Sequence, residues 1–287
     1  MGRVFCKNST FISKLVINTT KYNIKFHVCI LNWNGQEVLC DCVQSILNNQ
    51  FDSFKVTVID NGSDDFKPTE LDSKVNIIKL NKNYGFARGY NLGISKAKID
   101  NDEYLILLNN DTKVDENFFI NLTESIQSKK AESIYGPKII FDDAKDLIWY
   151  GGGKVKLDRG IIEHLGIRKS SRDFSIESNT DYVTGCCMIV KKSIYDDLGG
   201  FDESFFMYNE DVDFCLRAKL NKIQCIYLPS VIISHKVSSS LGGYFSRKKI
   251  LMKIKSAFLL YKKYYSKPKA ILLLVKYCIR SLMSIKL

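Results

Sequence analysis

The sequence predicts an α/β fold with a mostly parallel sheet flanked by helices. From residue 26 onward, short apolar runs rich in strand formers alternate with segments whose apolar residues recur at helix spacing. Polar residues follow four of the predicted strands, at the point where each strand ends. With 287 residues, 45% of them hydrophobic, the chain can bury a large core. Alternation of this kind indicates parallel strands joined by helical crossovers.

The elements of the first half follow in regular order. We expect strands over residues 26–31, 54–59, 75–80 and 104–108. We expect helices over residues 38–47, 86–97 and 116–126. The fourth strand, YLILL, is fully apolar, whereas the helical segments place apolar residues on one face.

The second half is less regular. Residues 140–180 contain a triple glycine at 151–153 and a polar stretch, which indicates a hairpin-and-loop excursion that could cover a substrate. Beyond it we expect strands over residues 183–190 and 224–228, a short helix over 192–198, and a helical pattern from Val212 to Leu220.

Charge divides the chain into two parts. All 31 acidic residues precede residue 214, whereas 16 of the 42 basic residues follow it. We therefore expect a body over residues 1–243 and a tail over 244–287, built of one or two basic amphipathic helices broken near Pro268. Such helices can lie on an anionic membrane, pack on the body or a sister subunit, or bind nucleic acid. The membrane surface is favoured, and no nucleic-acid partner is expected because no recognised motif accompanies the charge.

The absence of a signal-peptide pattern and the spacing of the cysteines predict a cytoplasmic protein. The nine cysteines show no CxxC spacing, which suits a reducing compartment. The N-terminus has no signal-peptide pattern, and no run of about 18 apolar residues suggests a membrane span. Together with the tail, this predicts a protein peripheral to the inner face of the cell membrane.

The polar residues at the strand ends predict a pocket. They are Asn32 and Asn34; Asp60, Asn61 and Gly62; Asn83 and Gly85; and Asn109, Asn110 and Asp111. Ligands of such sheets bind beyond the carboxyl ends of the strands. Each group is also typical of an ordinary turn, so that alternative stays open.

Several side chains suit a nucleotide diphosphate. Asp60 can accept a hydrogen bond from a nucleobase N–H, and Arg88 can hold a diphosphate in a bidentate contact or remain a solvated helix charge. Asp111 can coordinate a divalent cation, and His235 can add a nitrogen ligand that favours manganese, although a lone histidine is more often structural. GxGxxG and P-loop patterns are absent, which weighs against dinucleotide and P-loop sites.

Glu210 and Asp211 are the candidate catalytic pair. They follow an aromatic patch and begin a helical pattern, so burial and the helix dipole both act on their ionisation. Such a carboxylate can serve as a general base. The alternative is that acids simply favour helix starts.

Ordered segments between residues 26 and 236 resemble the family 2 glycosyltransferases, in particular their bacterial rhamnosyltransferase-like branch. The segments are ILNWNGQEVLCDCVQSIL, VTVIDNGSDD, NKNYGFARGYNLGI, YLILLNNDT and VTGCCMIVKKSIYDDLGGFDESFFMYNEDVDFCLRA, followed by His235. The resemblance implies a GT-A type, Rossmann-like fold. It also implies inverting transfer of a sugar, rhamnose by analogy with the branch, from a nucleotide-diphosphate sugar to an acceptor hydroxyl.

The resemblance assigns roles to the site residues. The resemblance maps donor contacts onto Asn32, Asn34, Asp60, Gly62, Asn83, Gly85 and Asn91. Asn61 and Asn110 join them from the strand-end pattern, and Arg88 joins them as a candidate diphosphate contact, although Arg88 stands where a small residue is common in the family. The metal motif falls on residues 109–111 with His235, for Mg²⁺ or Mn²⁺, and the catalytic base falls on Asp211 beside Glu210. Asn109 stands where many relatives carry an acid, which keeps a non-catalytic nucleotide-sugar or polysaccharide-binding protein as the alternative.

The implied partners are a nucleotide-sugar donor and a glycan or lipid-linked glycan acceptor in cell-surface polysaccharide synthesis. A homo-oligomer stays open.

Overall fold

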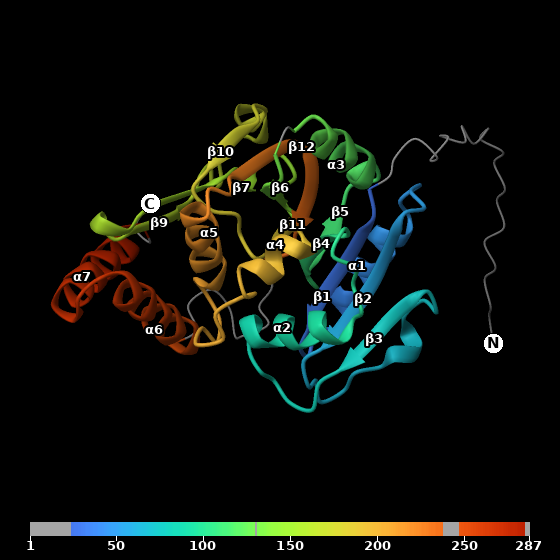
Figure 1. Cartoon of the computed structure of the whole chain (residues 1–287), viewed down its shortest axis with the longest axis horizontal. Coiled ribbons are helices and arrows are strands. Elements are labelled where there is room, and N and C mark those ends of the chain that lie inside the picture. The colour runs from blue at the N-terminus through green and yellow to red at the C-terminus, as the bar shows by residue number, and fades with distance from the viewer. Residues whose placement is uncertain (1–23, 130, 238–246, 285–287) are drawn as a thin grey trace.

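The computed structural model describes residues 24–129, 131–237 and 247–284, and its centre is one large sheet (Figure 1). The order along the sheet is β10-β12-β6-β11-β4-β1-β2-β3, with β5 paired to β12 and β7 paired to β6. The strands of the first half are β1 (Phe26–Asn32), β2 (Phe54–Asp60), β3 (Val75–Lys79), β4 (Tyr104–Asn109) and β5 (Thr112–Val114). Those of the second half are β6 (Ile134–Phe141), β7 (Ile148–Tyr150), β10 (Ser178–Thr180), β11 (Cys187–Lys191) and β12 (Cys225–His235). The predicted α/β class is confirmed.

The β3-β2-β1-β4 half of the sheet is parallel and matches the predicted strands closely. Side chains alternate across β1, so Val28 and Ile30 face one side of the sheet while Cys29 faces the other. The first side is covered by α1 (Gln36–Leu47) and α3 (Phe118–Gln127). The second is covered by α2 (Phe86–Lys96), α4 (Lys192–Asp197) and α5 (Glu210–Leu220). The result is a three-layer α/β/α arrangement.

The other half of the sheet mixes directions, and the sequence did not predict all of it. Strand β6 contains Gly136 and Pro137, residue types that argue against an interior strand, yet it lies between β12 and β11. Pro137 pairs with Leu228, where the register between β6 and β12 shifts. The proline therefore occupies an irregular place in the ladder, and neighbouring strands supply the burial that the local pattern does not indicate.

The excursion at 140–180 is a hairpin with loops, as expected. Its ordered parts include β8 (Gly153–Lys156), β9 (Ile161–His164) and the short 3₁₀ helices η3 (Leu157–Arg159) and η4 (Ser171–Phe174). Strands β8 and β9 pair with each other in a separate two-stranded sheet. A further 3₁₀ turn, η2 (Pro68–Glu70), lies between β2 and β3.

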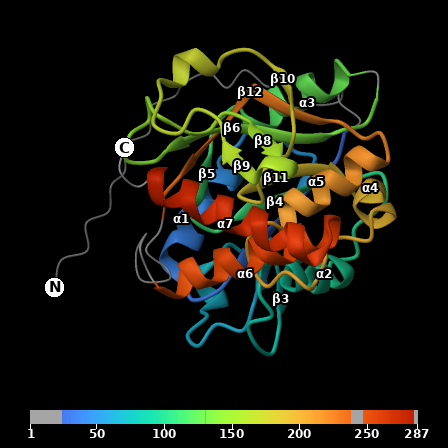
Figure 2. The same cartoon turned by 90° about the vertical axis from the view of Figure 1, so that its left-hand side faces the viewer.

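The tail forms two helices, α6 (Arg247–Tyr264) and α7 (Lys267–Ser284), which lie side by side next to α5 and the β8–β9 hairpin (Figures 1 and 2). The predicted break is confirmed, because Pro268 falls in the first turn of α7, where its missing N–H is tolerated. Leu260 of α6 joins the core under α5, and Leu273 of α7 packs near η3. The predicted division at residues 243 and 244 falls outside the described residues.

In the described part of the chain, no helix combines the length and the apolar character that crossing a membrane requires.

Candidate active site

The carboxyl ends of three parallel strands bring the predicted polar residues to one edge. Asn32 at the end of β1 is in register with Asp60 at the end of β2, and Leu31 is in register with Asn109 of β4. Asn32 Oδ1 accepts a hydrogen bond from Asn110 Nδ2 at 2.7 Å, which joins the β1 and β4 ends directly. Parallel register therefore places these side chains together, as the sequence predicts.

The loops after β1 and β2 are tied to each other. Asn34 Oδ1 accepts from the Asp64 amide at 2.9 Å, and Asn34 Nδ2 donates to Asp64 Oδ2 at 3.0 Å. Ser63 Oγ accepts from the Asn34 amide at 2.9 Å, while the Ser63 amide donates to Asp60 Oδ1 at 3.3 Å. Asp60 is buried, and this loop holds its carboxylate in place at the edge of the sheet.

Asn61 joins the end of β2 to the loop before α2 by side-chain hydrogen bonds. Its Nδ2 donates to Asn83 Oδ1 at 3.2 Å and to the Gly85 carbonyl at 3.0 Å, while its Oδ1 accepts from the Tyr84 amide at 3.0 Å. Asn83 Oδ1 also accepts from the Gly85 amide at 2.8 Å. The side-chain amide of Asn61 therefore forms its hydrogen bonds with backbone and side-chain groups of the protein itself.

Two predicted glycines occupy positions that a side chain would disturb. Gly62 has φ of +72°, and an added Cβ would lie 2.4 Å from the Lys82 backbone. Gly85 has φ of +81°, and an added Cβ would lie 2.3 Å from the Phe206 carbonyl oxygen. The Phe86 amide donates to the same Phe206 carbonyl at 2.7 Å. Gly85 therefore lets the loop before α5 approach the start of α2.

The predicted donor contacts on α2 lie against the loop that follows α4. Arg88 Nε is 3.4 Å from Glu203 Oε2, and its guanidinium lies 4.9 Å from the Tyr84 ring centroid. Asn91 donates to the Phe201 carbonyl at 2.8 Å and to Glu203 Oε1 at 3.1 Å, and its Oδ1 accepts from Tyr195 and from the Phe201 amide. Asn91 is fully engaged within the protein, so we assign it the positioning of this loop.

Asp111 and His235, predicted as metal ligands, come together from distant parts of the chain. The antiparallel pairing of β5 with β12 sets His235 opposite Thr112, and Asp111 Oδ1 lies 3.2 Å from His235 Nε2. Both side chains are nearly buried, and Asp111 Oδ1 has no hydrogen-bond partner. The ring of Trp149, from β7, contacts the His235 ring edge-on at 4.5 Å between centroids. Trp149 thus restricts the orientation of His235.

Glu210 and Asp211 occupy the first turn of α5. Asp211 Oδ2 accepts from the Gly185 amide at 2.8 Å, and Oδ1 accepts from the Val212 amide at 2.8 Å. Burial raises the pKa of Asp211, and these hydrogen bonds only partly oppose the shift. Burial, with the neighbouring Asp211 charge, raises the pKa of Glu210 well above its usual range, and Glu210 Oε2 is buried without a hydrogen-bond partner. The carboxylates thus differ, since Asp211 is held and partly exposed while Glu210 is enclosed.

The segment before β11 connects the two carboxylate groups of the site. The prediction of a strand from residue 183 is wrong at its start, because β11 begins at Cys187. The Val183 amide donates to Cys215 Sγ, the Gly185 amide to Asp211, and the Cys186 carbonyl accepts from the Asn109 amide at 2.9 Å. The Gly185 amide thus bonds to Asp211, while the Cys186 carbonyl extends the contact between β11 and β4 by one residue.

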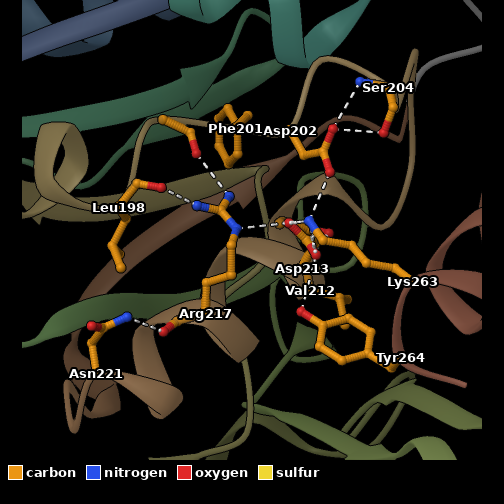
Figure 3. A network of polar contacts seen from close by, with 12 residues as sticks. Leu198, Phe201, Asp202, Ser204, Val212, Asp213, Arg217, Asn221, Lys263 and Tyr264 are labelled. Atoms are coloured by element: carbon orange, nitrogen blue, oxygen red, sulfur yellow. Dashed lines mark hydrogen bonds and ion pairs between the residues drawn. The ribbon is translucent and has the colours of Figure 1, made fainter.

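An ionic network around the buried Asp213 carboxylate, which the sequence analysis missed, anchors α5 (Figure 3). Asp213, with 0% exposure, accepts from Arg217 Nε at 2.9 Å and from Tyr264 Oη at 3.0 Å, and Lys263 Nζ lies 2.8 Å from its Oδ1. Arg217 also donates to the carbonyls of Leu198 and Gly200. The i,i+4 spacing of Asp213 and Arg217 was the available sequence signal. The sequence around Trp149 and around the α6 residues gives no sign of these contacts, because their partners lie far away in the chain.

Comparison with known proteins gives a family match that includes the strand-end residues of the site and ends before Glu210, Asp211 and His235. A family model described as Glycosyl transferase family 2 matches residues 27–199. Rhamnosyltransferase WbbL of Escherichia coli K12 is 30% identical over 174 residues, covering 57% of this chain and 65% of that protein. The chain therefore matches slightly less than two thirds of this relative's length.

Solved structures share the fold at low identity. A crystal structure of GalNAc-T7 with UDP, GalNAc and Mn²⁺ superimposes with a TM-score of 0.65 at 16% identity, covering 87% of this chain and 51% of that one. Staphylococcus aureus TarS 1–349 in complex with UDP-GlcNAc gives 0.56 at 15% identity, covering 89% and 72%. These likenesses show the GT-A fold.

Proposed function

Because this chain belongs to glycosyl transferase family 2, we propose that it transfers a sugar from a nucleotide-diphosphate sugar to an acceptor hydroxyl, with inversion at the sugar carbon. The observation that carries the proposal is the position of Asp211. Its carboxylate accepts hydrogen bonds from the amides of Gly185 and Val212. The carbonyl of Cys186, next to Gly185, accepts from the amide of Asn109, the end of the strand that leads into Asn110 and Asp111. A general base beside a donor-binding edge is what single-step glycosyl transfer requires.

Asp211 would take the proton of the acceptor hydroxyl as that oxygen attacks the sugar carbon. The bond from the sugar carbon to the diphosphate oxygen breaks as the new bond forms, so the configuration inverts. Burial and the neighbouring Asp211 raise the pKa of Glu210 well above its usual range, whereas two amide hydrogen bonds favour the charged form of Asp211, so Asp211 would be the member of the pair that acts as base. No observation favours the non-catalytic alternative.

A divalent cation, Mg²⁺ or Mn²⁺, fits Asp111 and His235. Two ligands about 2.1 Å from one ion at a right angle are roughly 3 Å apart, close to the 3.2 Å separation of Asp111 Oδ1 and His235 Nε2. Asp111 Oδ1 is buried and accepts no hydrogen bond, which supports the same role. Among the described residues no cluster of three His, Cys, Asp or Glu side chains could hold an ion, so donor phosphate oxygens and water would complete its shell. When bound, the ion would stabilise charge on the departing diphosphate.

The donor would lie along the polar edge. Proposed contacts are Asn32, Asn34, Asp60, Gly62, Asn83, Gly85, Arg88 and Asn110, with Asn61 and Asn91 positioning their loops. Complexes of structural neighbours with UDP and UDP-GlcNAc support a nucleotide-sugar, and the name of the E. coli relative suggests rhamnose as the sugar. The acceptor would be a glycan or lipid-linked glycan in polysaccharide synthesis.

We propose that the outer face of α6 and α7 binds the anionic inner surface of the cell membrane, which would place the enzyme in the cytoplasm. Ile271, Leu272, Val275 and Ile279 form an exposed apolar stripe on α7, at positions that share one helix face. No acidic residue occurs after Asp213, so the charge around the stripe complements anionic lipid.

Vesicle co-sedimentation tests the membrane proposal. Leu272→Ser with Val275→Ser should release the protein from phosphatidylglycerol vesicles, whereas Ile176→Ser, at an even more exposed apolar site outside the tail, should not. Equal binding of all three proteins, or equal binding to neutral vesicles, would reject it.

Thermal stabilisation against a panel of nucleotide diphosphates and nucleotide-sugars, with and without Mn²⁺ or Mg²⁺, tests the donor proposal. A selective, metal-dependent rise in Tm, followed by turnover of the stabilising donor, is expected. Absence of both would reject the enzyme assignment.

A further inference from the structure

The turn that precedes the catalytic pair has an unfavourable backbone. Tyr208 and Asn209 have φ of +73° and +62°, so two consecutive residues with side chains occupy the left-handed region. Asn209 is the residue directly before α5. Such conformations persist where surrounding contacts over-determine them, and they cluster at functional sites.

The contacts that hold this turn come from α6. Ser256 Oγ donates to the Tyr208 carbonyl and accepts from Asn209 Nδ2 at 3.1 Å, so one buried hydroxyl bridges both left-handed residues. One helical turn earlier on α6, Lys253 Nζ lies 5.4 Å from the centroid of the Tyr208 ring.

The same helix also holds α5 just beyond the catalytic pair. Lys263 and Tyr264 contact the buried Asp213 carboxylate, and Lys263 bonds to Asp202 at 2.7 Å as well (Figure 3). The first backbone hydrogen bond of α5 runs from the Asp213 amide to the Asn209 carbonyl at 2.9 Å. Glu210 and Asp211 therefore lie between two points of attachment to α6.

We propose that Ser256 is a positioning residue for Asp211, and that α6 is part of the catalytic unit as well as of the tail. The proposal rests on the proposed transferase function. By holding Tyr208 and Asn209 in the left-handed conformation, Ser256 sets the direction in which α5 begins and so the direction in which the Asp211 carboxylate points. Loss of this bridge would misplace the base, whereas the donor edge, which is built by the ends of β1, β2 and β4, would stay intact.

Ser256→Ala is the direct test, with Ser266→Ala as the matched control at an exposed serine between α6 and α7. We expect Ser256→Ala to lower kcat roughly 10- to 100-fold, the scale of misplaced catalytic groups, with the Kd for nucleoside diphosphate unchanged. Hydrogen exchange in the peptide covering residues 205–214 should become faster. Ser266→Ala should match the wild type in all three measurements.

Asn209 provides a second test that does not alter α6. Asn209→Gly and Asn209→Ala both remove the bond to Ser256, but only glycine takes positive φ freely. We expect the glycine variant to keep at least about tenfold more activity than the alanine variant, because the left-handed turn is retained at lower cost.

The outcomes separate this proposal from the function on which it rests. A wild-type protein that turns over no nucleotide-sugar would reject the function, while exchange of residues 205–214 would still report on the bridge. An active wild type with unchanged kcat and exchange in Ser256→Ala would overturn the positioning role. Parallel loss of nucleotide binding and Tm would also overturn it, since that pattern indicates general destabilisation. If Ser256→Ala fails to fold, equal activity of the two Asn209 variants would overturn it.

Discussion

Asp211 Oδ2 accepts a hydrogen bond from the Gly185 amide at 2.8 Å, and this contact connects the two halves of the site. The next residue, Cys186, accepts through its carbonyl from the amide of Asn109, the first residue of the proposed metal motif. Gly185 and Cys186 thus link the proposed base to the strand that leads into Asp111. The predictions below concern parts of this connected structure.

Asp211→Asn removes the proposed base while keeping the size of the side chain. We expect kcat to fall by about 10²- to 10⁴-fold, the usual contribution of general base catalysis, with donor affinity retained. Steady-state kinetics and nucleotide titration measure the two effects. Asp173→Asn, at an exposed carboxylate, is the control. Full activity of Asp211→Asn would contradict the assignment of the base.

Glu210→Gln should raise Tm, and the gain should grow with pH. Since burial raises the pKa of Glu210 in the folded state, its ionisation destabilises the fold as pH rises above the ordinary value of 4.5. The neutral glutamine avoids this loss. Thermal melts at pH 5 and pH 8 measure the difference, and an equal change in Tm at both values would count against an enclosed, protonated Glu210.

His235→Ala should weaken metal activation. Removal of one of the two protein ligands is expected to raise the Mn²⁺ concentration needed for half-maximal activity at least 10- to 100-fold, the range seen when even outer-shell partners are lost. The Mn²⁺-dependent part of the Tm gain with nucleotide should shrink in parallel. An unchanged metal requirement would assign His235 a structural role beside Trp149.

Gly85→Ala should destabilise more than Gly199→Ala. Both glycines have positive φ, +81° and +74°, so alanine carries a backbone cost of about 1–3 kcal/mol, and at Gly85 the ψ of −174° adds to it because that region is essentially open only to glycine. Only Gly85 has a close neighbour, the Phe206 carbonyl, whereas nothing lies within 4 Å of a Cβ at Gly199. Denaturant unfolding of both variants gives the difference, and equal losses would mean that the loop before α5 adapts.

Lys263→Met should lower stability through the buried Asp213. Removing one partner of a buried charge is strongly destabilising, by up to about 3–5 kcal/mol, and Arg217 and Tyr264 will reduce the loss here. Lys262→Met, at the adjacent exposed lysine, should have little effect. Chemical denaturation tests the pair, and similar stability of the two variants would show that the Lys263 contact contributes little.

That the polar strand ends meet at one edge could be predicted, because parallel strands place their carboxyl ends on the same side of the sheet. Asn32, Asp60 and Asn109 each end an apolar strand, and parallel register brings such ends to one edge. Residue chemistry and the resemblance both suggested Asp111 and His235 as ligands, but their proximity was not visible in the local sequence, since 124 positions separate them and the pairing of β5 with β12 brings them together. The contacts of Asn61 and Asn91 within the protein were not visible in their local sequence either.

The sequence by itself determined the alternation of strands and helices, the polar edge, the family and the basic tail, because these depend on local periodicity and on residue type. Tertiary structure alone decided that β6 is an interior strand despite Pro137, that Trp149 packs on His235, and that α6 contacts the turn formed by Tyr208 and Asn209. Burial and long-range hydrogen bonds outweigh local propensity at these places, and no short window of sequence contains both partners of such contacts.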